Sequence, residues 1–311
     1  MTPFVVYNGA SGGLGRYLGP AFVDRAVVAA PVSSRLGDTT ELEAELARMP
    51  IDPGSPMAFV QSAAMVSVRQ CEEHPATAFD VNVTRTMATI GAVAGWAAGR
   101  NSPLRVVFVS SGHVYAAPQP GNRLTESAST RPQSVYAQTK LEGEERIAAL
   151  GADHDLDVVI ARVFGMIAPG QSPEFLVPGL ITRIRTGDLA AVPGLDYVRD
   201  YLDARDVARY LASLAVDPIT AQDEDGRLVV NVCSGEEARI GDLLDALLAL
   251  SYRSDPGRLA EARRLVGSAP GRPTDIEWSV GDPALLSQVT PGLIRSIPIP
   301  QTLTDALADQ P

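Results

Sequence analysis

The stretch "FVVYNGASGGLGR" (residues 4–16) decides how this sequence folds. A short apolar run, typical of a buried strand, passes into a glycine turn and then into a helix-like pattern. Gly9, Gly12 and Gly15 have the GxxGxxG spacing of turns that cradle a dinucleotide pyrophosphate, and Gly13 and Leu14 lie inside it. Glycine permits unusual backbone angles and lets phosphate oxygens approach the N–H groups that begin the helix. The turn predicts a dinucleotide site, although a turn built for packing alone has the same spacing.

Apolar, β-branched runs alternate with helix-like stretches along the first three quarters of the chain. The expected strands are residues 4–8, 26–32, 57–61, 104–111, 157–164 and 227–234, and the expected helices are 14–25, 39–49, 75–98 and 136–150. This alternation indicates an α/β fold with a parallel sheet covered on both faces. We predict a doubly wound Rossmann domain from residues 1–164, to which 203–234 return. Pro and Gly are frequent beyond it, so we expect residues 165–202 and 235–311 to form a smaller, irregular substrate lobe.

Composition excludes several classes of partner. The 311 residues are 45% hydrophobic and carry a formal net charge of −11, which argues against nucleic acid or an anionic membrane as a partner. Cys71, Cys233 and the 3 histidines lack metal-ligand spacing, so we expect neither a metal site nor a disulfide. The apolar stretch 88–98 is interrupted by glycine, and no basic region precedes an apolar run at the N-terminus. We expect a cytoplasmic protein without a membrane segment.

The residues at the end of the second expected strand indicate whether the cofactor is NAD or NADP. There an acid binds the adenosine ribose of NAD, whereas an arginine accepts the 2′-phosphate of NADP. Ser33, Ser34 and Arg35 occupy this place, and no acid follows until Asp38. Two hydroxyls and a guanidinium suit a phosphate better than a diol, so we expect NADP(H) to be favoured over NAD. Arg35 as a solvated loop residue is the open alternative.

Lys140, the single lysine among 26 basic residues, belongs to a candidate catalytic group. It comes four residues after Tyr136, so both side chains lie on one helix face. An ammonium favours the ionised form of a neighbouring phenol, and Lys140 would help Tyr136 to exchange a proton with a substrate oxygen. Ser111 ends the strand 104–111 at the carboxyl edge of the sheet, where ligands of open α/β folds bind. We predict that Ser111, Tyr136 and Lys140 are catalytic.

A family resemblance joins these motifs and covers nearly the whole chain. The extended short-chain dehydrogenase/reductases of nucleotide sugars have landmarks similar to "GASGGLG" (9–15), "QSAA" (61–64), "FDVNVTRT" (79–86), "VFVSSGHVY" (107–115), "RPQSVYAQTK" (131–140), "RDYLDARDVARYL" (199–211) and "NVCSG" (231–235). The resemblance implies that Lys140 bonds the nicotinamide ribose. It implies that the cofactor site also includes Ser62, Ala63, Ala64, Asn82, Tyr136 and Val163. It further implies a homodimer built from helices 75–98 and 136–150.

The nearest branch by resemblance is a reductase. Dehydratases of this family place an acid pair after the catalytic hydroxyl, where this chain has Gly112 and His113, so dehydration is disfavoured. Residues 168–184 and 272–286 resemble the GDP-4-keto-6-deoxymannose reductases. The expected reaction is NADPH-dependent reduction of a 4-keto-6-deoxy sugar, GDP- or dTDP-linked, with Tyr136 as proton donor. By the same resemblance Arg199 and Arg272 would bind the substrate diphosphate.

The sequence leaves alternatives open for the role of His113 and for the activity of the protein. His113 is an acid/base, a substrate hydrogen-bonding group together with Gly112, or a structural residue. The protein as a whole is then a reductase, an epimerase with tightly bound NAD(P), or a Rossmann protein that binds NADP without turnover. Two departures from the family bear on substrate and cofactor: residues 162–165 lack an expected amide, and the short segment between Ser34 and residue 61 suggests that a helix–strand unit has been lost near the adenine.

Overall fold

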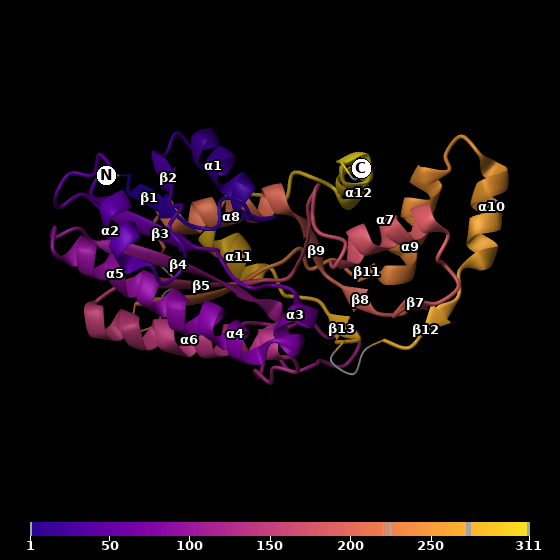
Figure 1. Cartoon of the computed structure of the whole chain (residues 1–311), viewed down its shortest axis with the longest axis horizontal. Coiled ribbons are helices and arrows are strands. Elements are labelled where there is room, and N and C mark those ends of the chain that lie inside the picture. Colours follow the sequence, from indigo (N-terminus) through magenta and orange to yellow (C-terminus); the bar gives the residue numbers. More distant parts are fainter. Residues whose placement is uncertain (1, 220, 222, 224–225, 272–274, 310–311) are drawn as a thin grey trace.

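The predicted Rossmann sheet forms the centre of the molecule (Figure 1). The computed structural model describes residues 2–219, 221, 223, 226–271 and 275–309. Six strands are hydrogen-bonded in the order β10-β5-β4-β3-β1-β2, and every pair is parallel. Their bounds are β1 Phe4–Tyr7, β2 Ala29–Pro31, β3 Met57–Gln61, β4 Leu104–Ser111, β5 Asp157–Val163 and β10 Arg227–Val232. The α/β fold class predicted from the sequence is confirmed.

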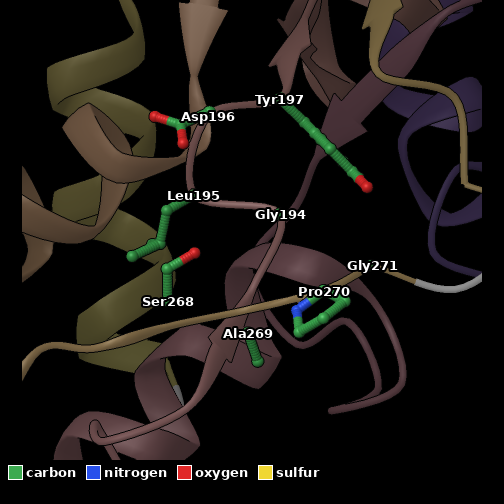
Figure 2. A pocket seen from close by; sticks show the side chains of 8 residues that line it. All are labelled: Gly194, Leu195, Asp196, Tyr197, Ser268, Ala269, Pro270 and Gly271. Atoms are coloured by element: carbon green, nitrogen blue, oxygen red, sulfur yellow. The ribbon is translucent and has the colours of Figure 1, made fainter.

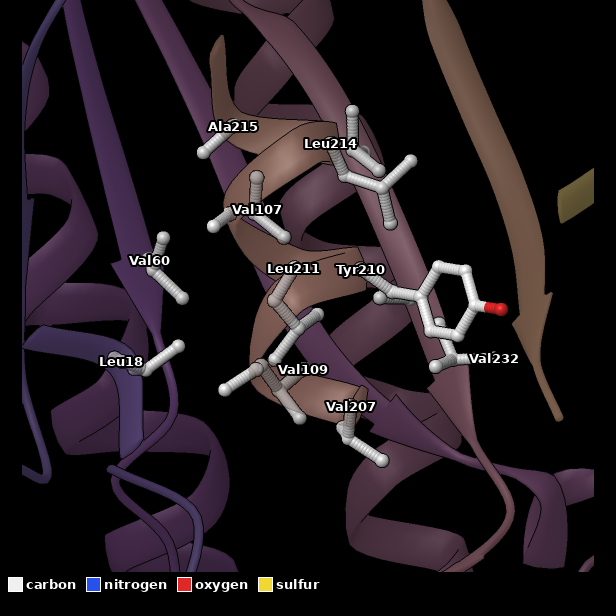
Figure 3. Packing of buried hydrophobic residues seen from close by; sticks show 14 of the residues in the cluster. Leu18, Val60, Val107, Val109, Val207, Tyr210, Leu211, Leu214, Ala215 and Val232 are labelled. Carbon is white, nitrogen blue, oxygen red and sulfur yellow. The ribbon is translucent and has the colours of Figure 1, made fainter. Parts of the chain in front are cut away.

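Helices cover both faces of the sheet because successive strand residues point to opposite sides. On one face, α1 (Gly15–Asp24) and α8 (Ala204–Val216) pack on strand residues such as Val107 (Figure 3). α11 (Ala284–Val289) belongs to the same apolar cluster. On the other face, α2 (Thr39–Leu46), α5 (Thr86–Ala98) and α6 (Val135–His154) pack on residues such as Phe108. The two layers hold the carboxyl ends of the strands in fixed positions.

The helix expected at 75–98 consists of three consecutive segments. α4 (Pro75–Phe79) leads into a π-helical turn, η1 (Asp80–Arg85), which leads into α5. A shorter helix, α3 (Val68–Glu73), precedes them, and the hydroxyl of Ser67 caps its N-terminus. Such wide turns are often found at functional sites. This one carries Asn82, a predicted cofactor-site residue.

The remaining elements pack around a separate apolar cluster. α7 (Leu176–Thr186), α9 (Ile240–Ser251) and α12 (Ile299–Asp309) share this core, and α10 (Pro256–Leu265) packs at its edge. Short strands accompany them: β6 (Gly165–Ile167) pairs with β9 (Tyr201–Asp203), β7 (Val192–Pro193) with β12 (Ser268–Ala269), and β8 (Val198–Arg199) with both β11 (Ala238–Arg239) and β13 (Trp278–Ser279). Within the described ranges no helix is long and apolar enough to cross a bilayer.

Candidate active site

The glycine turn has the shape of a phosphate-binding turn. Gly9 adopts a φ of +73°, and the N–H of Gly12 donates to its carbonyl oxygen over 2.8 Å. A Cβ added at Gly15 would lie 2.0 Å from the same oxygen, so the helix can begin this close to the strand only with glycine. No described side chain caps the N-terminus of α1 at Leu14, and the N–H groups of Arg16 and Tyr17 donate to carbonyls of the turn. Among the described residues, the N–H groups of residues 13–15 have no acceptor, so the turn fits a pyrophosphate.

The loop after β3 lies against this turn. The buried Asn8 accepts hydrogen bonds from the N–H groups of Ser62 (2.8 Å) and Ala63 (2.9 Å), and the Ser62 hydroxyl donates to the Asn8 carbonyl. Asn82 holds the continuation of the loop, because its side chain bonds both the N–H and the carbonyl oxygen of Met65. Ser62, Ala63, Ala64 and Asn82 thereby border the same edge of the sheet. Asn8 was not predicted from the sequence, because its role depends on a contact between two strand ends.

An acid lies at the end of β2, which the sequence analysis missed. The Ser33 hydroxyl and N–H donate to the carboxylate of Glu45 over 2.5 Å and 3.0 Å, respectively. Glu45 belongs to α2 and is half-buried there, next to the buried Leu46. Ser34 is half-buried and Arg35 exposed, and Arg35 has no ion pair with any residue that the structure describes. Part of the predicted phosphate site is therefore occupied by a carboxylate.

Ser111 and Tyr136 meet at the carboxyl edge of the sheet. Ser111 is the last residue of β4, and Tyr136 lies in the first turn of α6, where the Ser134 hydroxyl caps the helix. The Ser111 hydroxyl accepts the N–H of His113 over 3.2 Å and lies near enough to the phenol of Tyr136 to affect its pKa. Burial raises the pKa of Tyr136 to about 12, and the interaction with Ser111 counteracts part of that rise. Tyr136 is thus a protonated phenol at neutral pH, placed to donate.

Lys140 lies one helical turn beyond Tyr136 and is buried. Its ammonium donates to the carbonyl oxygen of Val109 over 2.9 Å and lies 5.3 Å from the centre of the Phe108 ring. Burial lowers the pKa of Lys140 to about 8, against the opposing charge of Glu144. The predicted lowering of the Tyr136 pKa by Lys140 is not found, because burial dominates at Tyr136 and Lys140 is not among the groups that shift it.

A buried ion pair lies behind this group. Arg162 of β5 donates to the carboxylate of Glu144, with 2.6 Å between Nη2 and Oε2, and Ser110 donates to the same carboxylate. Both charged side chains are at most 8% exposed. The ring of Tyr115 lies against the Arg162 guanidinium at 4.7 Å. Arg162 and Ser110 thus hold Glu144 one helical turn beyond Lys140, where its charge opposes the lowering of the Lys140 pKa. The spacing of four residues in the sequence was a signal for this neighbour that was not used.

His113 and Arg199 were predicted to meet the substrate, and the structure places them near Tyr136 and near each other. His113 lies in a short 3₁₀ turn, η2 (Gly112–Val114), and its ring meets that of Tyr136 edge-on at 6.0 Å. Burial and the charge of Arg199 lower the pKa of His113 to about 4, so its imidazole is neutral at pH 7. Arg199 is half-buried, with its guanidinium 5.6 Å from the ring of Tyr197.

Two further predicted residues, Gly112 and Val163, lie at the same edge of the sheet as Ser111. Gly112 packs closely on Phe164, whose ring an added Cβ would approach to 3.0 Å. Val163 is the last residue of β5, beside Ser111 in the sheet register. Arg272 lies outside the described residues.

A cavity opens beside Tyr197. It has a volume of about 340 Å³ and lies between the loops 194–197 and 268–271 (Figure 2). Gly271 packs so closely on Tyr197 that an added Cβ would lie 2.4 Å from the tyrosine oxygen. Tyr197 thus lines the cavity and also lies against the guanidinium of Arg199. Among the described residues no group of three or more His, Cys, Asp and Glu side chains could hold a metal ion, and both cysteines are free.

Comparison with known proteins places the geometry among nucleotide-sugar enzymes. Residues 7–233 match the model of the NAD dependent epimerase/dehydratase family. GDP-6-deoxy-D-mannose reductase of Pseudomonas aeruginosa is 30% identical over 231 residues, which are 70% of this chain and 72% of that protein. A dTDP-glucose 4,6-dehydratase of Streptomyces griseus is 30% identical over 154 residues, 49% of this chain and 44% of that enzyme.

Solved structures agree with the fold over nearly the full length. The structure of RMD from Pseudomonas aeruginosa complexed with NADPH superposes with a TM-score of 0.78 at 25% identity, covering 99% of this chain and 98% of that one. UDP-glucose 4-epimerase of Thermus thermophilus in complex with NAD gives a TM-score of 0.79 at 22% identity, covering 98% of each chain. The second likeness concerns the fold alone.

Proposed function

The chain belongs to the NAD dependent epimerase/dehydratase family, and from this premise we propose that it is an NADPH-dependent reductase of a 4-keto-6-deoxy nucleotide sugar. Its relatives are NAD(P)-dependent reductases, dehydratases and epimerases of nucleotide sugars. The observation that carries the proposal is that Ser111, at the end of β4, and Tyr136, in the first turn of α6, lie near each other with Lys140 buried one helical turn away. This arrangement suffices for proton donation to a ketone oxygen, the one proton transfer that a reduction requires.

The residues present fit the cofactor. The glycine turn would hold its pyrophosphate, Lys140 its nicotinamide ribose, and Ser34 and Arg35 the 2′-phosphate that distinguishes NADPH. When bound, the reduced nicotinamide supplies a hydride to the carbonyl carbon. Ser111 would hold the ketone oxygen in place while Tyr136 donates the proton that completes the alcohol. Lys140, an ammonium at neutral pH, would donate to the ribose hydroxyls and so hold the nicotinamide near Tyr136.

Two features favour reduction over the other reactions of the family. A dehydratase needs a carboxylate beside the catalytic hydroxyl, whereas Gly112 and His113 follow Ser111. An epimerase needs a base that removes a proton from carbon, and His113, whose pKa is lowered to about 4, is a weak base. We assign His113 to hydrogen bonding with the substrate. Epimerisation with tightly bound NAD(P) and cofactor binding without turnover are the alternatives.

We further propose that residues 165–202 and 235–311 form the nucleotide-sugar lobe, apart from α11, which packs on the central sheet. Arg199 would bind the diphosphate, because a guanidinium matches phosphate oxygens, and the cavity beside Tyr197 would take the nucleotide, GDP or dTDP. We also propose a cytoplasmic homodimer that pairs α5 and α6 with their copies. Added Cβ atoms at Gly91 and Gly95 would meet open space, so α5 has a flat outer face for such packing.

The test is the loss of NADPH absorbance on addition of GDP-4-keto-6-deoxymannose, beside its dTDP counterpart and an NADH control. We expect oxidation of NADPH with one of the two sugars. Tyr136→Phe should lower kcat by about 10²-fold or more while NADPH binding persists, because only the proton donor is lost. No oxidation with either sugar, by protein that binds NADPH, would refute the proposed reaction.

A further inference from the structure

The contact between Ser33 and Glu45 lies where a nicotinamide cofactor is selected. Ser33 follows β2 by two residues, beside the glycine turn that ends β1 in the same parallel sheet. In dinucleotide folds the group at this strand end meets the adenosine ribose, whose 2′ position is a hydroxyl in NAD and a phosphate in NADP. The polar groups of Ser33 that face this position donate to a carboxylate from another element.

Two other charged residues near this strand end, Asp38 and Arg85, have partners of their own. Asp38 caps α2 by accepting the N–H of Glu41. Arg85 packs its stem against Gly37 and pairs its guanidinium with Asp80. Arg35 forms no ion pair with any described residue. Of the acids on α2, Glu41 and Glu43 are exposed, whereas Glu45 is half-buried and accepts from Ser33.

We propose that Glu45 is a cofactor-selecting residue that acts against NADP. This inference rests on the cofactor assignment of the proposed function and deepens it. The 2′-phosphate is an anion that competes with the Glu45 carboxylate for the hydroxyl and N–H of Ser33. The ribose hydroxyls of NAD, in contrast, are donors that the carboxylate can accept. Arg35 attracts the phosphate, Glu45 opposes it, and the preference for NADPH is smaller than Arg35 alone would produce.

The experiment is equilibrium binding of NADPH and NADH, followed by the fluorescence of the nicotinamide, to the full chain and to Glu45→Gln. Glutamine has the same length and removes the charge, and its one remaining oxygen can still accept from Ser33. The matched control is Glu43→Gln, an exposed acid of the same helix. Glu45→Ala is a second variant, which removes the contact altogether. Thermal unfolding of each variant establishes that it is folded.

We expect Glu45→Gln to tighten NADPH binding by about tenfold, the size of one like-charge contact near the surface, with NADH binding unchanged or weaker. Glu45→Ala should change the ratio of the two dissociation constants in the same direction, and Glu43→Gln should leave it unchanged. If Glu45→Gln leaves that ratio as it is, the inference is overturned. Turnover of the 4-keto sugar is measured separately, so an inactive protein with the expected change in ratio would refute the reductase proposal and keep this one.

Discussion

Replacement of Gly15 by alanine tests whether the glycine turn has the geometry described. Gly15 is the first residue of α1 and is buried against the carbonyl group of Gly9. The added Cβ would lie 2.0 Å from the Gly9 oxygen and 2.5 Å from its carbon. Both are backbone atoms, so no side-chain rotation relieves the overlap, and the turn must open by more than 1 Å to restore ordinary contact.

The expected cost is large for a single methyl group. Overpacking a buried site costs about 1–3 kcal/mol, and a backbone clash belongs at the upper end, so we expect the free energy of unfolding to fall by about 3 kcal/mol. The opened turn should also weaken NADPH binding by at least about tenfold, because the first N–H groups of α1 no longer converge.

Gly13→Ala is the matched control. Its added Cβ would have its nearest neighbour, the Cγ of Gln171, at 3.7 Å, an ordinary contact. We expect its free energy of unfolding to stay within about 0.5 kcal/mol of the parent protein. Urea unfolding of both variants and fluorescence titration with NADPH make the comparison. Equal stability of Gly15→Ala and Gly13→Ala would refute the geometry of the turn.

Two further predictions concern the group behind Tyr136. The kcat should decrease as pH rises through about 8, because burial has lowered the pKa of Lys140 to about 8 and the required ammonium is then lost; a pH profile that stays flat to about pH 10 would contradict this. Glu144→Gln should lower the free energy of unfolding by about 3 kcal/mol or more, since it leaves the Arg162 charge buried without its partner. The half-exposed Glu142→Gln should cost less than about 1 kcal/mol, and equal losses in urea unfolding would argue against the buried pair.

The strands could be predicted from the sequence because a parallel sheet buried on both faces requires continuous apolar runs. The expected strands at 57–61 and 104–111 agree with β3 and β4 to the residue. The helix expected at 75–98 was correct in extent, but its wide turn was missed. A π-helical turn has no marker in the spacing of apolar residues, because it forms where packing on both sides requires it.

The positions of Ser111 and Tyr136 were predictable because a single element determines each of them. Ser111 ends a strand and Tyr136 begins a helix, and both ends belong to the same edge of an α/β sheet. Glu45 and Glu144 were missed because each meets its partner across elements that are separate in sequence. The effect of Lys140 on Tyr136 was wrongly predicted because burial, which depends on the completed fold, outweighs the neighbouring charge.

The π-helical turn η1 has one more consequence. Its extra residue rotates everything beyond it by about 100° relative to a continuous α-helix. Asn82 can therefore face the loop after β3 while Ile90, further along the same helical path, faces the sheet and its core. The turn therefore separates the orientation of Asn82, toward the loop after β3, from the orientation of the core residues of α5. Substitutions in α5 that change the packing of the core can then leave Asn82 hydrogen-bonded to the loop after β3.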